Sequence, residues 1–304
     1  MIEQRRIALS TGVTLNVALA GDAAAPPVIL LHGFPESHRT WRAMAPLLAD
    51  RFRLIMPDQR GFGGSDRPPE VEAYRTDALV DDLYALAGAL GLDRFAVVGH
   101  DWGGAVAWAA ALRRDKRLAR LAIVNSPHPV IFQRSLIEDP AQRAASQYIT
   151  AFRNPAFEQA VAAMGFESFF DKSFAGHVDL AAIPADERRR YIDDWSRPGA
   201  LNAMLNWYRA SQMIVPPPGA TVPLPEWLLS AFLAIRVPTL VVWGMRDKAL
   251  LPIQLDGLER LVDDLAIVRL PGAGHFAPWE AGEEVASALA PFLAGMGTAT
   301  ARRA

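Results

Sequence analysis

The stretch Val97–Gly104, "VVGHDWGG", joins an apolar strand to a glycine-flanked turn with an aspartate at its tip. The residues that follow, "GGAVAWAAAL", are small and helix-forming, so the pattern is strand, sharp turn, helix. A turn of this GxDxG form has the shape of a nucleophile elbow, in which the central side chain stands exposed above the sheet. Gly99 and Gly103 give the backbone room for that turn. Taken alone, the pattern also fits an Asp101 that only caps the helix.

Short apolar runs of the same kind recur along the chain and predict eight strands. They are "RRIALS", "TLNVAL", "PVILLHG", "FRLIMPD", "RFAVVGH", "RLAIVNS", "VPTLVVWG" and "LAIVRLPG". The first two, joined by Thr11 and Gly12, have the pattern of an antiparallel hairpin. From residue 27 onward, helical patterns alternate with the strands, for example at 38–49, 74–90 and 103–114. We therefore predict an α/β fold, a mostly parallel eight-stranded sheet flanked by helices.

The alternation stops between residues 129 and 229. The sequence there is aromatic and helical, and it finishes in the proline-rich connector "VPPPGATVPLP" before strand character resumes at Val237. An insertion that leaves a sheet and returns to it is typical of a lid over the carboxyl edge, where open α/β sheets bind ligands. We predict a core domain of residues 1–128 and 230–304 and a helical cap domain of residues 129–229.

Composition narrows the classes of function. The 304 residues carry a formal net charge of -2 and no sustained basic stripe, which argues against nucleic-acid binding. No apolar stretch is long enough to span a bilayer, and the charged N-terminal residues have no apolar segment behind them, so we expect a cytoplasmic protein. The chain has no cysteine, which excludes disulfides, thiolate nucleophiles and cysteine-ligated metals.

Two further residues complete a catalytic pattern with Asp101. Asp247 follows the strand "VPTLVVWG", and His275 lies in "LPGAGHFAPWE" after the last strand. Hydrolases with a nucleophile elbow supply their triad in the order nucleophile, acid, histidine, and these residues occur in that order. Singly, each fits a loop-capping or turn residue; together they predict a catalytic triad.

At these positions the sequence resembles the epoxide hydrolases of the α/β-hydrolase fold. The segments that carry the resemblance are "HGFPES", "DQRGFGGSDRP", "GHDWGG", "GAGH" and, in the predicted cap, "LNWYRAS". The first three are shared with haloalkane and haloacetate dehalogenases. The resemblance implies that Asp101 attacks an epoxide carbon and forms an ester. An ester can be hydrolysed by water, whereas the ether that a serine would form cannot readily be cleaved.

The same resemblance assigns the remaining roles. His275, oriented by Asp247, would take a proton from the water that attacks the Asp101 carbonyl, so we expect activity to fall at acid pH. The backbone N–H groups of Phe34 and Trp102 would stabilise the resulting oxyanion.

The family also uses two cap tyrosines as acids toward the epoxide oxygen. Tyr208 falls on "LNWYR", and Tyr148, in "SQYITAFRNP", matches the second position more loosely. Tyr191, in "RRRYIDD", is the alternative for the second position. A single tyrosine at such a position also fits a packing residue of an amphipathic helix. Two at matching positions favour catalytic acids.

We predict neither a cofactor nor a metal. His100, His128 and His177 have neither the HExxH spacing nor the clustering with carboxylates that a metal site requires. The glycine-rich "RGFGGSD" matches no phosphate-binding motif and has no helix directly behind it, so we interpret it as a structural loop near the site.

Two rival functions remain at this stage. A dehalogenase would use the same ester chemistry and bind halide through N–H donors, one of which Trp102 could supply. However, haloalkane dehalogenases commonly carry Asn where this chain has Phe34, and haloacetate dehalogenases carry arginines after the nucleophile, where this chain has apolar residues or glycine. A catalytically silent binding protein of the same fold would have no need of the five catalytic candidates.

The predicted partners are a small apolar epoxide and water. The cap is rich in aromatic side chains that suggest an aryl or alkyl substrate, namely Phe152, Phe166, Phe169, Phe170, Phe174, Trp195 and Trp207. The sequence leaves open which of them face the pocket, and it leaves open a monomer or a homodimer.

Overall fold

The computed structural model describes residues 2–230 and 232–296. Residue 231 and residues 297–304, which belong to the predicted core segment, lie outside the described residues. Eight strands form one sheet in the order β1-β2-β4-β3-β5-β6-β7-β8. Their bounds are β1 Glu3–Ala8, β2 Thr14–Ala20, β3 Pro27–Leu31, β4 Arg53–Pro57, β5 Phe95–His100, β6 Leu118–Val124, β7 Thr239–Gly244 and β8 Leu265–Leu270.

The sheet is parallel from β4 to β8 and antiparallel at β1 and β2. β1 and β2 form the predicted hairpin, and β2 also runs antiparallel to β4. The other neighbours, β3 with β4 and β5, β5 with β6, β6 with β7 and β7 with β8, are all parallel. The prediction of a mostly parallel eight-stranded sheet is confirmed. Because parallel strands all end at one edge, the loops after β3, β5, β6, β7 and β8 meet there.

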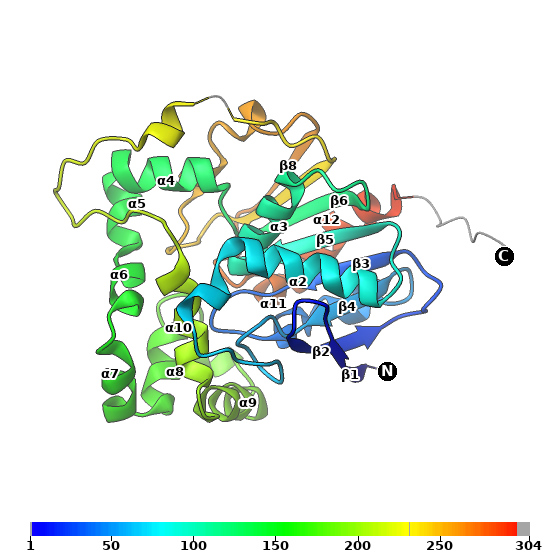
Figure 1. Ribbon diagram of the computed structural model, residues 1–304, viewed down its shortest axis with the longest axis horizontal. Coiled ribbons are helices and arrows are strands. Elements are labelled where there is room, and N and C mark those ends of the chain that lie inside the picture. The colour runs from blue at the N-terminus through cyan, green and yellow to red at the C-terminus, as the bar shows by residue number, and fades with distance from the viewer. Residues whose placement is uncertain (1, 231, 297–304) are drawn as a thin grey trace.

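Helices cover both faces of this sheet (Figure 1). α2 (Thr76–Ala89) and α3 (Trp102–Leu112) pack on one face, and α1 (Ala45–Leu48), α11 (Ala277–Glu280) and α12 (Gly282–Ala294) pack on the other. The alternation along β3 explains the two layers: Ile29 and Leu31 join the first cluster, and Val28 and Leu30 the second. All four are buried, as expected of a strand in a parallel sheet with both faces covered.

One predicted helix is wrong. The sequence predicts a single helix over 38–49, but the structure has a 3₁₀ turn, η1 (His38–Trp41), followed by the separate short helix α1. Pro46 lies in the first turn of α1. Inside a continuous helix its ring would clash with the carbonyl four residues earlier, so the helix has to restart just before it.

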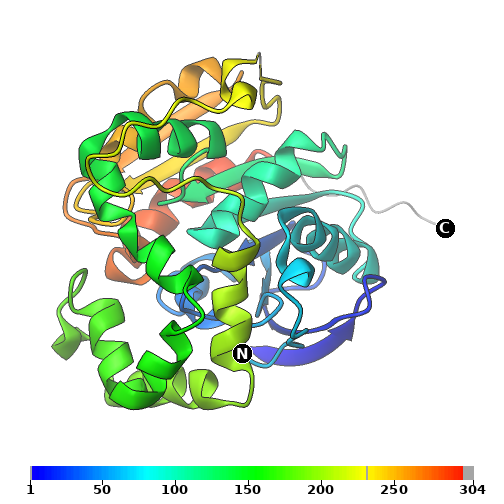
Figure 2. The ribbon, with the colours of Figure 1, turned by 60° about the vertical axis from the view of Figure 1, so that its left-hand side comes forward.

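Seven helices occupy the segment between β6 and β7. They are α4 Pro129–Glu138, α5 Pro140–Ala145, α6 Gln147–Arg153, α7 Phe157–Met164, α8 Phe166–Phe174, α9 Ala185–Ser196 and α10 Ala200–Ala210. Short 3₁₀ turns complete the described elements, η2 Val71–Tyr74, η3 Leu180–Ala182, η4 Glu226–Leu229, η5 Pro252–Leu255 and η6 Leu258–Arg260. Residues 211–225, which include the predicted connector, have no helix or strand. Figures 1 and 2 both show α5 to α9 grouped together at one end of the sheet.

Hydrogen bonds and one ion pair hold this inserted segment to the core. The indole N–H of Trp195 donates to the carbonyl of Pro35 at 2.7 Å, and the indole N–H of Trp207 donates to that of Arg60 at 2.9 Å. Arg39 forms an ion pair with Glu187 of α9. No helix among residues 2–230 and 232–296 is long and apolar enough to cross a membrane.

Candidate active site

Asp101 lies at the end of β5 in a backbone conformation that side chains rarely adopt. Its φ is 50° and its ψ is -121°. Two glycines make this turn possible through close approach: a Cβ on Gly103 would lie 2.0 Å from the carbonyl oxygen of Leu31, and one on Gly33 would lie 2.3 Å from the Cβ of Asp101. The carboxylate makes no capping hydrogen bond to α3. The interpretation of Asp101 as a mere helix cap therefore loses its support.

Two backbone N–H groups lie at this turn. The N–H of Phe34 donates to Oδ1 of Asp101 at 2.8 Å. Trp102 is the first residue of α3, so its N–H has no partner within the helix. The structure thus brings both predicted oxyanion donors to the turn. Since Phe34 holds Oδ1, the other oxygen, Oδ2, is the one turned toward His275.

His275 connects the two aspartates. Its Nδ1 lies 2.8 Å from Oδ2 of Asp247, and its Nε2 lies 3.8 Å from Oδ2 of Asp101. All three residues are in loops at the carboxyl edge of the sheet, after β5, β7 and β8. The histidine can therefore exchange a proton on the Asp101 side while Asp247 fixes the orientation of the ring.

The charges around His275 set its protonation. Burial alone would lower the pKa of His275, but the negative charges of Asp247 and Asp101, together with the hydrogen bond to Asp247, outweigh burial and raise it to about 9. Burial acts in the opposite direction on Asp247, yet the neighbouring His275 holds the pKa of this carboxyl below its usual value. The geometry thus favours an ionised Asp247 paired with an imidazolium.

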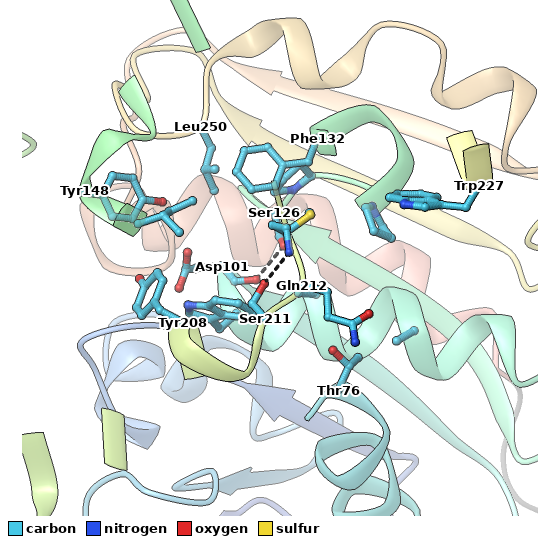
Figure 3. Close-up of a pocket in the computed structure, with 17 residues that line it drawn as sticks. Thr76, Asp101, Ser126, Phe132, Tyr148, Tyr208, Ser211, Gln212, Trp227 and Leu250 are labelled. Carbon is cyan, nitrogen blue, oxygen red and sulfur yellow. Dashed lines mark hydrogen bonds between the residues drawn. The ribbon is translucent and has the colours of Figure 1, made fainter. Parts of the chain in front are cut away.

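Tyr148 of α6 and Tyr208 of α10 face the same carboxylate. Figure 3 shows both side chains beside the carboxylate of Asp101. The two rings are 6.1 Å apart in a T-shaped arrangement, and Tyr208 also packs edge-on against Phe34 and Trp102, each at 5.1 Å. Burial and nearby negative charge raise the pKa of Tyr148. Burial, followed by Tyr148 and Asp101, does the same for Tyr208. Both phenols therefore keep their protons and can donate them in hydrogen bonds.

A largely apolar cavity of about 250 Å³ adjoins these groups. Asp101, Tyr148 and Tyr208 lie at one end of it, and Thr76, Gln212 and Trp227 lie at the other (Figure 3). Its apolar lining comes from α3, α4, α6 and nearby loops, and includes Trp102, Ala105, Ala109, Pro127, Pro129, Phe132, Ile149 and Leu250. An uncharged organic molecule could bind there with its reactive group against Asp101.

The sequence matches the family described as alpha/beta hydrolase fold over residues 26–282. Epoxide hydrolase A of Mycobacterium tuberculosis is 33% identical over 331 aligned residues, which cover 96% of this chain and 97% of that protein. The chain belongs to the α/β-hydrolase fold family, in its epoxide hydrolase branch.

Solved structures agree with this membership. A structure from work on novel epoxide hydrolases of the α/β-hydrolase superfamily in metagenomes from hot environments is 45% identical, with a TM-score of 0.88 and coverage of 97% of this chain and 99% of that one. A mutant epoxide hydrolase of Bacillus megaterium, complexed with its product, a naphthyloxy-propane-1,2-diol, is 27% identical. Its TM-score is 0.83, with 95% of this chain and 99% of that one covered. The protein is a hydrolase of this fold.

Tyr191, the alternative second tyrosine in this α/β-hydrolase, lies in another environment. Its hydroxyl donates to Oε1 of Glu36 at 2.6 Å, and the same carboxylate accepts from the indole of Trp279 at 3.0 Å. Tyr191 thus joins α9 to the core, and the structure brings Tyr148, not Tyr191, to the cavity beside Asp101.

Most of the aromatic side chains of the inserted segment pack against other aromatic rings. The ring centroids of Phe170 and Phe174 are 4.7 Å apart, and Phe174 stacks on Trp195 at 6.3 Å. Phe152, by contrast, lines a cavity next to Asp101. The sequence left open which of these aromatic residues face the pocket, and the structure brings Phe152 to it while Phe170, Phe174 and Trp195 pack together. The apolar lining of the 250 Å³ cavity comes mainly from other residues.

The sequence analysis did not identify two residues that position parts of the site. Asn125, after β6, donates from Nδ2 to Oδ2 of Asp247 at 2.8 Å and accepts from the N–H of Gly244 at 2.8 Å. Arg153 of α6 donates to the carbonyls of Tyr208, Ser211 and Met213 at 2.9, 2.8 and 2.8 Å. Asn125 thus orients the acid, and Arg153 ties α6 to the end of α10. The position of Asn125, a polar residue directly after a predicted strand, was the sequence feature that could have identified it.

The remaining histidines are not grouped with other metal-ligating residues in the part of the chain that the structure describes. Among the described residues, no group of three or more His, Asp or Glu side chains is arranged to hold a metal ion. His100 lies 2.8 Å through Nε2 from the carbonyl of His275, and His128 packs against Trp108. His177 lines a cavity beside His275.

Proposed function

We propose that this protein hydrolyses an epoxide to a vicinal diol through a covalent ester on Asp101. The observation that carries the proposal is the convergence of two phenol hydroxyls and one carboxylate on a single apolar cavity. A carboxylate can attack carbon, and a protonated phenol can assist an oxygen that leaves. An epoxide needs both actions at adjacent atoms. The residues at 129–229 would act as a cap domain that supplies the phenols.

In the first step Oδ2 of Asp101 attacks one epoxide carbon, and the bond from that carbon to oxygen breaks. Oδ2 suits this role because Oδ1 is held by the N–H of Phe34. The hydroxyls of Tyr148 and Tyr208 bind the epoxide oxygen, and one of them supplies its proton as negative charge develops there. The product of this step is a hydroxyalkyl ester.

In the second step His275 removes a proton from water, and the water oxygen attacks the carbonyl carbon of the ester. The N–H groups of Phe34 and Trp102 would stabilise the oxyanion until it collapses. The bond to the departing oxygen then breaks, this oxygen takes the remaining proton of the former water, and the diol leaves an ionised Asp101. The raised pKa of His275 is compatible with this role because esterification removes the negative charge of Asp101, which helps to hold the proton. The pKa then falls, the proton of the imidazolium passes to the phenolate left by ring opening, and the neutral imidazole becomes available as a base.

Comparison with relatives supports the same activity. The M. tuberculosis relative is named an epoxide hydrolase, and the B. megaterium structure holds a diol product that bears a naphthyloxy group. The apolar lining that includes Phe132, Ile149 and Leu250 is compatible with an aryl or alkyl epoxide. A cytoplasmic location and a monomeric or homodimeric state stay predictions from the sequence.

Dehalogenation is the alternative that the nucleophile alone would allow. Halide binding requires N–H donors, whereas the groups opposite Asp101 include two protonated phenols. This favours epoxide opening. The test is to incubate the protein separately with small epoxides, haloalkanes and haloacetates and to quantify diol and free halide. We expect diol without halide; halide without diol would overturn the proposal.

A further inference from the structure

Two cavities share the residues at the reacting centre. Asp101, Tyr148 and Tyr208 line both the 250 Å³ cavity and a second one of about 150 Å³. We call these the large arm and the small arm. Apart from the shared residues, α3, α4 and the segment at 211–213 line the large arm, and α8 and the loops after β3 and β8 line the small arm, while α6 and the loop after β7 contribute to both.

The volumes set the size of what each arm can hold. In other proteins a cavity of about 150 Å³ binds benzene, which has six non-hydrogen atoms. By the same scale the small arm holds a group of up to about six such atoms, and the large arm one of about ten. Since the arms meet at Asp101, a molecule that fills both would have its reactive atoms in the interior of its chain. An epoxide with a substituent on only one carbon would fill one arm.

The two arms also differ in chemistry. The large arm is mainly apolar near Asp101, whereas the small arm includes Lys172, Ser173 and His177. The hydroxyl of Ser173 is already occupied, because it donates to the carbonyl of Phe169 at 2.8 Å. Lys172 is exposed. His177 is therefore the polar group in the small arm that remains available for a ligand.

His177 has an unsatisfied polar atom. Its Nδ1 is buried and has no hydrogen-bond partner among the described residues. Its ring lies 5.7 Å from that of His275, which in turn lies 3.8 Å from Asp101. Because buried polar atoms are nearly always satisfied in folded proteins, this ring has unused hydrogen-bonding capacity at the wall of the small arm. The distances place it within reach of a short substituent on an epoxide at Asp101.

The protonation state of His177 indicates which group it binds. Burial, with a smaller effect from the charge of His275, lowers the pKa of His177 to about 4. The neutral ring offers one donor and one acceptor. A hydroxyl group has the same two functions and can satisfy either nitrogen. A carboxylate would also meet the cations Lys172 and His275 in this arm, but it would gain no charge pairing from the neutral ring of His177 and would lie near the carboxylate of Asp101.

We infer that the preferred substrate is an internal epoxide, with a bulky apolar group in the large arm and a short hydroxyl-bearing group in the small arm. The hydroxyl is bound by His177, which acts as a specificity-determining residue. This inference rests on the proposed epoxide hydrolysis.

The test compares three epoxides of matched shape. Styrene oxide has no group for the small arm, trans-β-methylstyrene oxide has a methyl group, and trans-3-phenylglycidol has a hydroxymethyl group. A neutral hydrogen bond of ordinary strength changes kcat/KM by about fivefold. We expect His177→Phe to lower the ratio of kcat/KM for the glycidol to that for the methyl compound by about this factor. Intrinsic reactivity differences between the two substrates cancel in this comparison.

Two further variants control the experiment. Gln212→Leu, at the far end of the large arm, should leave the ratio unchanged. His177→Asn retains a donor and an acceptor and should preserve part of the hydroxyl preference, even if His177→Phe folds poorly.

A ratio that is the same in wild type and His177→Phe would overturn the inference, as would faster turnover of 3-phenylglycidate than of the glycidol. Turnover of styrene oxide alone would also overturn it but leave the proposed function standing. Absence of diol from every epoxide would contradict the proposed function itself.

Discussion

The core and the inserted helices hold their site residues in different ways. Asp247, in the core, accepts hydrogen bonds from His275, Asn125 and the N–H groups of Ala249 and Leu250. Tyr148 and Tyr208, in the insertion, pack in a cluster of aromatic rings. The core therefore presents charged groups fixed by hydrogen bonds, and the insertion presents neutral phenols fixed by packing and by the α6–α10 connection.

This difference suggests a division of work in the proposed reaction. The core residues would form and hydrolyse the ester, and the insertion would decide which leaving group the ester-forming step accepts. Substitutions in the two regions should then slow different steps. Single-turnover kinetics separate these steps, because ring opening consumes epoxide and ester hydrolysis releases diol.

The largest expected effect concerns the phenols. Tyr208→Phe should slow ring opening, and the double change with Tyr148→Phe should reduce it by about a thousandfold or more, since loss of general-acid assistance has effects of this order. The measurement is epoxide consumption in a single turnover. Tyr191→Phe is the matched control, because its hydroxyl binds Glu36 and lies outside the cavity. Unchanged turnover in the double variant would remove both tyrosines from the mechanism.

A pH effect on stability should arise in the core. The pKa of His275 is raised from its usual value near 6.5 to about 9 in the folded protein. The resulting stabilisation, roughly 3 kcal/mol, is fully present below about pH 6.5 and is lost as the pH rises through about 9. Thermal unfolding of the wild type and of His275→Gln should therefore differ most at low pH and converge as the pH rises. A difference in stability that grows with pH would contradict this sign. Tyr148→Phe is the control, and its stability should depend on pH in the same way as that of the wild type.

Loss of the Asn125 side chain should slow ester hydrolysis. Asn125→Leu removes a hydrogen bond to the charged Asp247. The loss of such a bond should lower kcat about tenfold. Release of diol would slow, and consumption of epoxide would not. Asn16→Leu is a matched control, because Asn16 donates to Asp58 at 2.8 Å in the same kind of bond outside both arms. Equal slowing in both variants would argue for a general loss of structure.

Loss of the Arg153 side chain should affect the other step. Arg153→Met breaks three bonds to backbone carbonyls at the end of α10 and loosens the placement of Tyr208 relative to Tyr148. We expect ring opening to slow by a few-fold and ester hydrolysis to remain near wild type. Slower diol release with normal epoxide consumption would contradict the proposed division of work.

Local sequence patterns predicted the sheet and its active-site edge well. Each strand is a short apolar run, and the turn at Asp101 is marked by glycines that the close backbone approach requires. The resemblance to the epoxide hydrolases predicted Tyr148 over Tyr191, and the structure puts Tyr148 beside Asp101. The roles of these residues stay predictions.

Features that depend on tertiary packing were not predictable in this way. Sequence periodicity did not identify Phe170 and Trp195 as packing residues, because an aromatic helix face looks the same whether it covers a pocket or another helix. The contact between Asn125 and Asp247 joins residues far apart in the chain, and so does the small arm that includes His177 and Phe34. The break before Pro46 was visible in the sequence but was outweighed by the surrounding helical pattern.

The central claim is that Asp101 forms a covalent ester, and the most direct measurement is the intact mass of a variant that cannot hydrolyse it. His275→Gln keeps Asp101 and both tyrosines but removes the base, so the ester should accumulate when styrene oxide is added. The account predicts a protein heavier by the mass of one epoxide molecule, with the modification on the peptide that contains Asp101 and absent from a further Asp101→Ala change. Unmodified protein that still releases diol would contradict the account.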